Sequence, residues 1–419
     1  MRTFDLLTPE EALTRLYRAL DEAGQLPQSA YPIVQGALNV PVERIATATA
    51  RNRVLARDIL APTPLPEFRR STVDGYAVRA ASTPGVLRVI GEVRMGELTS
   101  LRVRLGDAVI VHTGGNVPEG ADAVLMVEHA RPIDQTFAGK IQTQVQLAPG
   151  DNIILEGEDV KAGEVVIPAG TRLREPEIGG LLSFGILEIP VTRRPRIALI
   201  ASGDEVVPAY AVTRPGQVRN INTPMLAALI ERHGGIPLDF GILPDRLDAF
   251  EQAAARAMHE ADGVVFMAGS SMSERDFTPE VVNHMGKPGI LVHGIAFRPG
   301  KPTLFAVCDG KPVFGLPGNP ISALVTGMMF VVPTLWRMQG ALNPPPPATV
   351  EVELTQEVKS PRELEHWFPV RLTGDGRAEP VPSKSNLIFS LSRASALVCA
   401  PIGVERLLAG ARVQARLLD

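Results

Sequence analysis

The sequence contains little cysteine, few aromatic residues and no excess of charge of either sign. Cys308 and Cys399 are the only thiols in 419 residues, so a disulfide-rich scaffold is excluded, and two distant cysteines cannot build a metal cage by themselves. Aromatic residues make up 5% of the chain, and 42 Lys and Arg against 46 Asp and Glu leave a net charge of −4. Because there is no basic excess, we expect no nucleic-acid partner. The scarcity of thiols is typical of proteins in a reducing cytoplasm.

Long apolar runs and several well-known catalytic motifs are also missing. The most apolar stretch, residues 321–336, contains Pro333 and falls short of the ~20 residues that a membrane-spanning helix needs, so we expect a buried core helix. No secretory start follows Met1, and we expect a cytoplasmic protein without a membrane partner. There is no HExxH pair, GxSxG elbow, Walker A sequence or GxGxxG after a strand. These absences argue against a zinc enzyme, an α/β-hydrolase, a P-loop NTPase and a Rossmann dehydrogenase.

The chain is instead rich in turn-forming residues, with 38 Gly and 37 Pro, and its length suits two to four domains. Residues 7–24 are expected to form a helix, because Thr8 can cap it, Pro9 suits its first position and Glu11 completes a capping box. Short strand-like runs separated by turns between residues 71 and 147 predict a small β-rich domain.

Residues 194–340 alternate between apolar runs and helical stretches. Runs such as 196–200 and 263–267 are typical of strands buried on both faces, and the alternation predicts a doubly wound α/β domain with a mostly parallel sheet. Beyond a stiff proline linker, further strand patterns predict a small C-terminal β domain. The expected fold class is multi-domain α/β plus β, and the expected domains are a discontinuous N-terminal domain (1–53 and 148–190), an inserted β-rich domain (54–147), the α/β domain (191–342) and the C-terminal domain (343–419).

Ligands of open α/β sheets bind outside the carboxyl ends of the strands, and the residues expected there are suited to phosphate. In the segment 315–322, Asn319 can cap a helix that begins at Pro320, and free backbone N–H groups would then form an anion site. Taken alone, the segment is better explained by an ordinary strand–turn–helix corner, because Gly-Asn-Pro turns are common. The segment Gly269–Ser271 offers a second phosphate cradle, or an exposed turn.

Charged residues accompany these loops. Arg298 and Lys301 add positive charge near a strand end, although surface solubility is the ordinary role of such residues. Acidic residues share the same edge, and Mg²⁺ usually binds one or two protein carboxylates together with substrate phosphates. Caps and salt bridges are the simpler explanation for at least one carboxylate, and Asp204 is expected to be a structural turn residue. The acidic residues at this edge are Asp204, Glu205, Asp245 and Asp276.

The β-rich domain contributes polar loops of its own. Asp74 stands before a glycine, either as an Asx-turn or as a site group, and Thr113 begins a glycine-rich turn. Residues 156–159 form a further acidic turn that ends at Asp159.

Taken together, seven segments in chain order resemble the molybdopterin molybdenumtransferase family (MoeA and the E domain of gephyrin). One such motif would be weak evidence, whereas seven in family order are specific. The segments are Ser71–Ala77 (STVDGYA), Thr113–Val124 (TGGNVPEGADAV), Gly157–Glu164 (GEDVKAGE), Ser202–Glu205 (SGDE), the Ser271/Asp276 loop, Arg298–Pro302 (RPGKP) and Gly315–Pro320 (GLPGNP).

The resemblance implies an elongated four-domain homodimer, with an elongated N-terminal domain, in which the α/β domain of one subunit faces the β-rich domain of the other. It implies Mg²⁺-dependent insertion of molybdate into adenylylated molybdopterin with release of AMP, with a molybdopterin adenylyltransferase as a partner. Positive charge for molybdate would come from Arg298 and Arg70. Glu205 and Asp276 are the implied metal ligands, and Asp74 the implied positioning or proton-transfer group. The catalytic cleft would contain Asp74, Thr113, Asp159, Glu205, Asp245 and Asp276, and the pterin phosphate and nucleotide would be held by Ser270, Ser271, Arg298, Lys301, Pro317, Gly318, Asn319 and Pro320.

The sequence departs from the family pattern at four positions. Ala268 and Ser273 replace two usual glycines, Arg298 stands where Lys is usual, and Gly294 stands where a further Lys is often found. Because Arg is a planar fork rather than a point charge, that exchange is not neutral. These departures motivate two alternatives to the enzyme, namely a pterin-binding scaffold with weakened catalysis and a molybdopterin adenylyltransferase.

Overall fold

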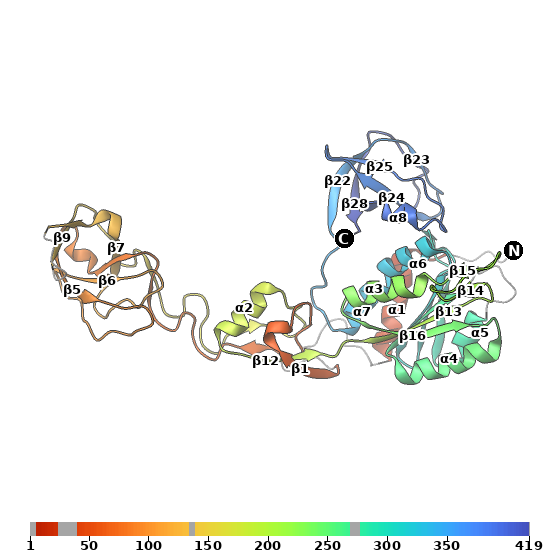
Figure 1. Cartoon of the computed structure of the whole chain (residues 1–419), viewed down its shortest axis with the longest axis horizontal. Helices are drawn as coiled ribbons and strands as arrows, with labels where there is room; N and C mark the ends of the chain where they lie inside the picture. Colours follow the sequence, from red (N-terminus) through yellow and green to blue (C-terminus); the bar gives the residue numbers. More distant parts are fainter. Residues whose placement is uncertain (1–5, 24–39, 134–138, 269–276, 419) are drawn as a thin grey trace. The chain divides into compact units, whose positions relative to one another are not determined.

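The computed structural model describes residues 6–23, 40–133, 139–268 and 277–418 (Figure 1). The chain divides into two compact units. The first unit contains residues 1–57, 169–182 and 186–419, and the second contains residues 58–168 and 183–185. The site residues of interest are therefore divided between two units, each with its own cores.

The second unit is built on a six-stranded sheet, which confirms the predicted β-rich domain. Its strand order is β7-β4-β6-β5-β9-β8, and alternating side chains feed two separate cores, one containing Leu87 and Leu125 and the other Val109 and Val124. Two short antiparallel pairs, β10–β3 and β11–β2, complete the unit. The strands are β2 (Ile59–Leu60), β3 (Arg70–Ser71), β4 (Gly75–Val78), β5 (Gly85–Glu92), β6 (Asp107–Val111), β7 (Ala123–Met126), β8 (Arg131–Pro132), β9 (Lys140–Thr143), β10 (Ile153–Ile154) and β11 (Val165–Ile167).

The first unit contains the predicted doubly wound sheet, with strand order β16-β13-β17-β21-β20-β18. The four strands from β16 to β21 run parallel, whereas β20 is antiparallel to both of its neighbours. The apolar runs 196–200 and 263–267 are the strands β13 and β17, as predicted. The strands are β13 (Arg196–Ser202), β16 (Ile236–Leu243), β17 (Gly263–Ala268), β18 (Pro288–His293), β20 (Leu304–Cys308) and β21 (Lys311–Pro317).

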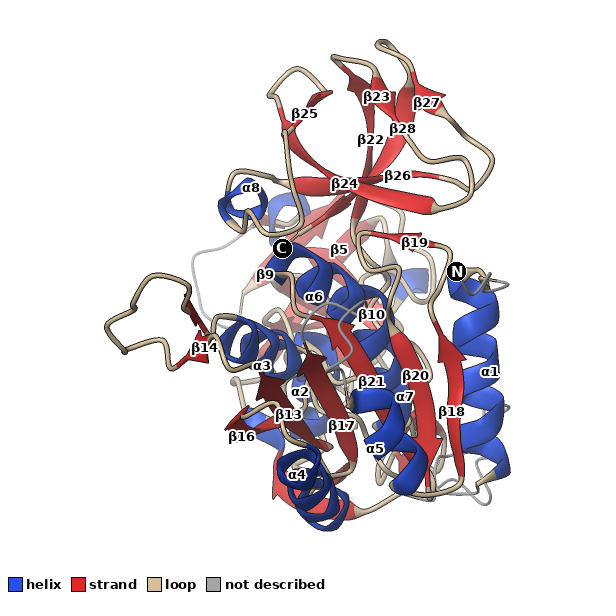
Figure 2. Ribbon diagram, turned by 90° about the vertical axis from the view of Figure 1, so that its right-hand side faces the viewer, coloured by secondary structure: helices blue, strands red, loops and turns tan. Residues whose placement is uncertain are grey.

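Helices cover both faces of this sheet (Figure 2). In β13, Ile197 and Leu199 pack on one face and Ala198 and Ile200 on the other, which explains the uninterrupted apolar sequence. Helices α3, α6 and α7 contribute to the first core and α4 and α5 to the second. The helices are α3 (Asn222–Arg232), α4 (Leu247–Glu260), α5 (Thr278–His284), α6 (Pro320–Thr326) and α7 (Val332–Met338).

Helix α1 (Pro9–Glu22) has the predicted capping box. The Thr8 hydroxyl accepts from the Glu11 backbone N–H, and the Glu11 carboxylate accepts from the Thr8 backbone N–H at 2.8 Å. Its buried residues Leu16 and Leu20 belong to the core of the α/β sheet. The first helix of the chain is thus part of the packing that supports the sheet.

The apolar segment after Asn319 forms a buried helix, as predicted, but Pro333 does not interrupt it. A π-helical turn, Gly327–Val331, connects α6 to α7 just before Pro333, so the hydrogen-bonding pattern of the helix changes next to the residue that lacks an N–H. Within the described residues, Pro320–Met338 is long and apolar enough to cross a membrane by composition, yet 72% of it is buried in the fold. Burial of this kind is characteristic of a core helix.

The C-terminal residues form a small closed β barrel. Strands β24, β25, β22, β28 and β26 pair in sequence, and β24 pairs with β26 to close the circle around a core that includes Phe368 and Val398. No helix or strand lies between α7 and β22, in agreement with the predicted proline linker (Figure 1). The elements are β22 (Thr349–Leu354), β23 (Val358–Lys359), β24 (Glu365–Leu372), β25 (Arg377–Pro380), α8 (Phe389–Ser392), β26 (Ala396–Ala400), β27 (Arg406–Leu407) and β28 (Arg412–Leu417).

The remaining elements precede the α/β sheet in the chain. Strand β1 (Val42–Ala46) pairs antiparallel with β12 (Glu188–Thr192), and α2 (Glu175–Ser183) lies between the second unit and β12 in sequence. This pairing joins residues more than 140 positions apart. The division into four domains with the stated boundaries stays a prediction.

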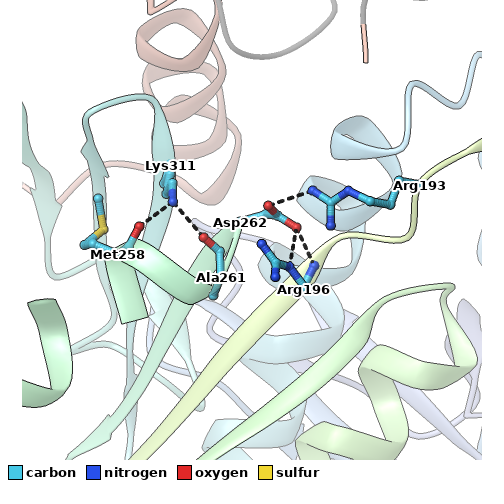
Figure 3. A network of polar contacts seen from close by, with 6 residues as sticks. All are labelled: Arg193, Arg196, Met258, Ala261, Asp262 and Lys311. Carbon is cyan, nitrogen blue, oxygen red and sulfur yellow. Dashed lines mark hydrogen bonds and ion pairs between the residues drawn. The ribbon is translucent and has the colours of Figure 1, made fainter. Parts of the chain in front are cut away.

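A polar network fixes the amino ends of three central strands (Figure 3). Asp262, just before β17, accepts from Arg193 at 2.9 Å and from the backbone N–H of Arg196 at 2.7 Å. The Lys311 ammonium group, at the start of β21, donates to the carbonyl oxygens of Met258 and Ala261. This network lies at the edge of the sheet opposite the carboxyl ends, so we assign it a structural role.

Candidate functional site

The carboxyl ends of the parallel strands meet at one edge of the sheet, as the sequence predicts. The strand register places Ser202 beside Leu243, and Ala268 beside Pro317. These strand ends therefore lie side by side. We call this edge the sheet rim, meaning the described residues at and after the ends of β13, β16 and β21 together with the segment before β20. It includes Glu205, Asp245, Arg298, Lys301 and Pro317–Pro320.

Asp204 and Glu205 occupy the first rim loop. The Asp204 carboxylate accepts from the backbone N–H of Asp245 at 3.1 Å, which ties the loops after β13 and β16 together. This bond agrees with the structural role predicted for Asp204. Glu205 is exposed, and its backbone carbonyl accepts from Val218 of the short β14–β15 pair (Val206–Val207 and Val218–Arg219).

The loop after β21 holds the segment expected to bind phosphate, and the structure modifies that expectation. Asn319 stands at the N-cap position of α6 with Pro320 at the first helical position, but its side chain makes no capping hydrogen bond. The backbone N–H of Ile321 donates to the Ser385 carbonyl of the C-terminal barrel at 3.0 Å. One of the N–H groups predicted to be free is therefore occupied, because the first turn of α6 lies against another part of the chain.

Asn222, the first residue of α3, was not predicted as a site residue. Its side-chain amide donates to the Gly318 carbonyl at 2.8 Å, and its Oδ1 atom is buried without a partner among the described residues. A buried acceptor without a donor costs free energy that a ligand N–H could recover. The sequence did offer one indication of this residue, because Asn222 begins the helix that follows the first rim loop.

Arg298 lies on a short strand shared with the C-terminal barrel. Strand β19 (Phe297–Arg298) pairs with β24, which sets Arg298 beside His366. Burial, with a smaller contribution from the Arg298 charge, lowers the pKa of His366 to about 4, so this imidazole is neutral at pH 7. Lys301 is exposed, and its backbone carbonyl accepts from Ile295 at 2.9 Å. The barrel thus helps to position one predicted cation of the rim.

In the second unit, Asp74 and Thr113 form one constellation. Asp74 Oδ1 accepts from the backbone N–H of Thr113 at 2.7 Å and from its hydroxyl at 3.1 Å. These two bonds, the backbone one foremost, hold the pKa of Asp74 below its ordinary value. Both residues are exposed, so the carboxylate is ionised and accessible at neutral pH.

The surroundings of Asp74 are fixed by tight backbone contacts. A Cβ atom at Gly75 would come within 1.9 Å of the Leu125 carbonyl oxygen, so only glycine fits next to Asp74. Backbone bonds between Ser71 and Gly114 and Gly115 hold the Thr113 loop against β3, the strand that carries Arg70. The Nε atom of Arg70 is buried without a partner among the described residues. Arg70, which is the cation proposed to attract molybdate, thus lies on the strand that is bonded to the Thr113 loop, and the same loop holds Asp74.

One residue next to Thr113, His112, was not predicted as a site residue, and the predicted residue Asp159 is on a separate turn of the same unit. His112, next to Thr113, contacts the Glu92 carboxylate at 2.8 Å. Asp159 is exposed on the turn after β10, and its backbone N–H donates to Leu65. In the described part of the chain, no hydrogen bond joins Asp159 to Asp74. Ser270, Ser271, Ser273 and Asp276 lie outside the described residues.

Comparison with known families accounts for nearly the whole chain. Residues 198–337, the α/β domain, match the family described as the probable molybdopterin binding domain. Residues 8–185 match the MoeA N-terminal region (domain I and II), and residues 351–418 match the MoeA C-terminal region (domain IV). The fold and these family matches therefore define a protein of molybdenum cofactor biosynthesis with a probable molybdopterin binding domain.

Individual relatives narrow the class. The chain is 33% identical to a molybdopterin molybdenumtransferase of Staphylococcus aureus, over 90% of this chain and 91% of the relative, and 31% identical to that of Bacillus subtilis, over 90% of each. A crystal structure of the molybdopterin biosynthesis MoeA protein from Pyrococcus horikoshii superposes with a TM-score of 0.79 at 29% identity, covering 99% of this chain and 100% of that one. The chain belongs to the molybdopterin molybdenumtransferase family. It is a transferase, as predicted, and the predicted fold class is confirmed.

Proposed function

We propose that this transferase inserts molybdate into adenylylated molybdopterin, in a Mg²⁺-dependent reaction that releases AMP. The observation that carries the proposal is the meeting of Glu205, Asp245, Arg298 and Lys301 at one sheet rim in a chain of this family. A phosphoanhydride and an oxyanion both need fixed donors and cations, and the rim offers both kinds. The chemistry of the side chains thus agrees with the reaction.

The proposed roles follow from charge and position. Arg298, Lys301 and the turn Pro317–Pro320 would bind the phosphate and nucleotide, together with Ser270 and Ser271. Arg70 and Arg298 would attract molybdate. Asp74, held ionised by Thr113, is suited to orient the reacting group or accept a proton. Asp159 and Asp245 complete the proposed set.

Glu205 and Asp276 are the proposed ligands of Mg²⁺. Carboxylate oxygens suit this hard cation, and Glu205 is exposed at the rim. Within the described residues there is no cluster of three or more His, Cys, Asp or Glu side chains that could hold a metal ion. With Glu205 and Asp276 as the proposed protein ligands, the substrate phosphates would supply the rest, which is the usual arrangement for Mg²⁺. Bound there, the ion would neutralise phosphate charge.

The proposal extends to assembly and location. The proposed assembly rests on the family resemblance, which implies a homodimer with the α/β domain of one subunit facing the β-rich domain of the other. We propose a cytoplasmic homodimer that receives its substrate from a molybdopterin adenylyltransferase. A mass measurement by light scattering during size-exclusion chromatography tests the dimer, and a mass of a single chain of 44.9 kDa would contradict it.

The decisive experiment follows AMP release from adenylylated molybdopterin in the presence of molybdate and Mg²⁺. Asp74→Asn is expected to reduce release at least 100-fold, because the amide can neither carry the charge nor accept the proton. The matched control Glu231→Gln removes an exposed carboxylate on α3 and should leave the rate unchanged. Tight pterin binding by the unaltered chain without AMP release would instead identify a scaffold.

A further inference from the structure

Three ionisable side chains lie at the ends of neighbouring strands in the second unit, where β6 lies between β4 and β5. Asp74 precedes β4, His112 follows β6 and Glu92 ends β5. We call these three residues the charged row. Of the three, only Asp74 has a proposed role in the transferase reaction, so the presence of the other two beside it is unexplained.

The strand register places Asp74 next to His112. Gly75 pairs with Val111 in the antiparallel β4–β6 ladder. The next position of that ladder sets Asp74 opposite His112. On its other side, the Asp74 carbonyl accepts from the Val127 backbone N–H at 3.0 Å, so Asp74 still follows the direction of β4. Residues directly opposite each other in such a ladder have Cβ atoms about 5 Å apart, which makes these two side chains neighbours.

Glu92 lies on the other side of His112. It pairs with Ile110 in the parallel β5–β6 ladder, and Ile110 and His112 share a face of the sheet because they are two positions apart. The Nε2 atom of His112 lies 2.8 Å from Glu92 Oε1. The two side chains are 39% and 31% exposed, so water reaches both. Two carboxylates thus face His112, one from β5 and one from the segment before β4.

The contact with Glu92 decides which nitrogen of His112 is free. An ionised carboxylate only accepts hydrogen bonds, so Nε2 carries the proton that joins it to Glu92. In the neutral imidazole, Nδ1 then has a free lone pair, and in the described part of the chain no hydrogen bond reaches this atom. An imidazole that is oriented by a carboxylate through one nitrogen and free at the other has the arrangement of a general base.

Within the row, the imidazole is better suited than Asp74 to accept a proton. The backbone and hydroxyl bonds from Thr113 lower the pKa of Asp74 most, and the charge of His112 lowers it further, so Asp74 is a weak base. A proton acceptor works best when its pKa is near the working pH. Histidine is the side chain whose charge ordinarily changes between pH 5 and 8. The ionised Asp74 is instead suited to stabilise a neighbouring imidazolium.

We propose that His112 is a catalytic proton acceptor of the transferase reaction, oriented by Glu92 and stabilised in its protonated form by Asp74. This inference rests on the proposed function. In the step that releases AMP, an O–H bond of water breaks and its proton passes to Nδ1. The water oxygen forms a bond to the phosphorus on the pterin side, and the P–O bond to AMP breaks, leaving its electron pair on the AMP phosphate. The imidazolium then returns its proton to solvent.

The pH dependence of AMP release tests this role on the full chain, with adenylylated molybdopterin, molybdate and Mg²⁺. The rate of the unaltered chain should fall as the pH is lowered from about 8 to about 5, because histidine takes up a proton in this range. His112→Gln should lower the rate at neutral pH about 100-fold and remove this fall. Glu92→Gln should lower the rate less and move the fall to lower pH, because the imidazolium loses a carboxylate beside it.

His259→Gln, which alters an exposed histidine on α4 of the first unit, is the control with the same change of side chain and should leave the rate and its pH dependence unchanged. If His112→Gln releases AMP as fast as the unaltered chain, the role of His112 is overturned and the proposed function stands. No release by the unaltered chain would instead contradict the proposed function, on which this role rests. Nitrogen-15 NMR of the unaltered chain needs no activity. It should find neutral His112 protonated at Nε2, and a proton at Nδ1 would overturn the proposal.

Discussion

At the scale of single residues, one of the four departures from the family pattern suits the local backbone. Gly294, where a Lys is often found, has a φ of +89°, and a Cβ atom there would lie 3.3 Å from Leu6. A lysine in this conformation would cost about 1–2 kcal/mol. The departure is therefore consistent with the local backbone, and Arg298 and Lys301 remain the described cations of that rim segment.

The hydrogen bond between Thr113 and Asp74 leads to a prediction about ionisation. Thr113→Val removes the hydroxyl donor and keeps the backbone one, so the pKa of Asp74 should rise towards its ordinary value without reaching it. Titration of the Asp74 carboxyl group by carbon-13 NMR measures this shift. Thr72→Val, which alters another exposed threonine, is the control and should leave the Asp74 pKa unchanged. An unchanged Asp74 pKa in Thr113→Val would show that the Thr113 hydroxyl does not lower this pKa.

At the scale of elements, the two ends of the parallel sheet have different tasks. The carboxyl ends carry the exposed charges of the rim, whereas the amino ends are fixed by Asp262 and Lys311. Burial raises the pKa of Asp262, but the bonds from Arg193 and Arg196 outweigh it and keep the pKa below its ordinary value. The network therefore stabilises the sheet at neutral pH and contributes no reacting group.

Asp262→Asn should lower the free energy of unfolding of the first unit by about 1.5–3 kcal/mol, because it weakens hydrogen bonds to a charged, largely buried group. Since the folded pKa is depressed, this stabilisation is present above the unfolded pKa of about 3.9 and is lost as the pH falls through the folded value. Urea unfolding at pH 7 and below pH 4 measures both effects.

The free energy of unfolding of Asp262→Asn should thus be lower than that of the parent chain at pH 7 and approach it in acid. Glu231→Gln, which alters an exposed carboxylate, should change the stability by less than about 0.5 kcal/mol at either pH. A deficit for Asp262→Asn that is equally large in acid would mean that packing, and not charge, explains its effect.

At the scale of the whole molecule, the second unit is an insertion with adjacent ends. Strands β2 and β11 pair at its boundary, with Leu60 beside Val165. In the first unit, Leu55 and Thr171 are hydrogen-bonded, so the chain returns to the point where it left. Each unit closes its own cores, which are the elements of independent folding.

Residues 58–168 expressed alone should therefore fold and unfold cooperatively, as measured by circular dichroism and by dispersed amide signals in NMR. Replacing the same residues by Gly-Ser-Gly in the full chain should leave the first unit folded and abolish transfer, because Asp74 and Thr113 are removed. A fragment without cooperative unfolding would show that the unit depends on contacts with the rest of the chain.

The sequence by itself determined the elements and the family. Uninterrupted apolar runs located strands such as β13 and β17 because both of their faces are buried, and the capping box of α1 depends only on Thr8 and Glu11, which are three residues apart. Only the tertiary structure decided which groups meet. The bond from Asn222 to Gly318 and the bond from the Ile321 N–H to Ser385 both join residues more than 60 positions apart. Local patterns cannot encode such contacts, because they arise from the packing of whole elements.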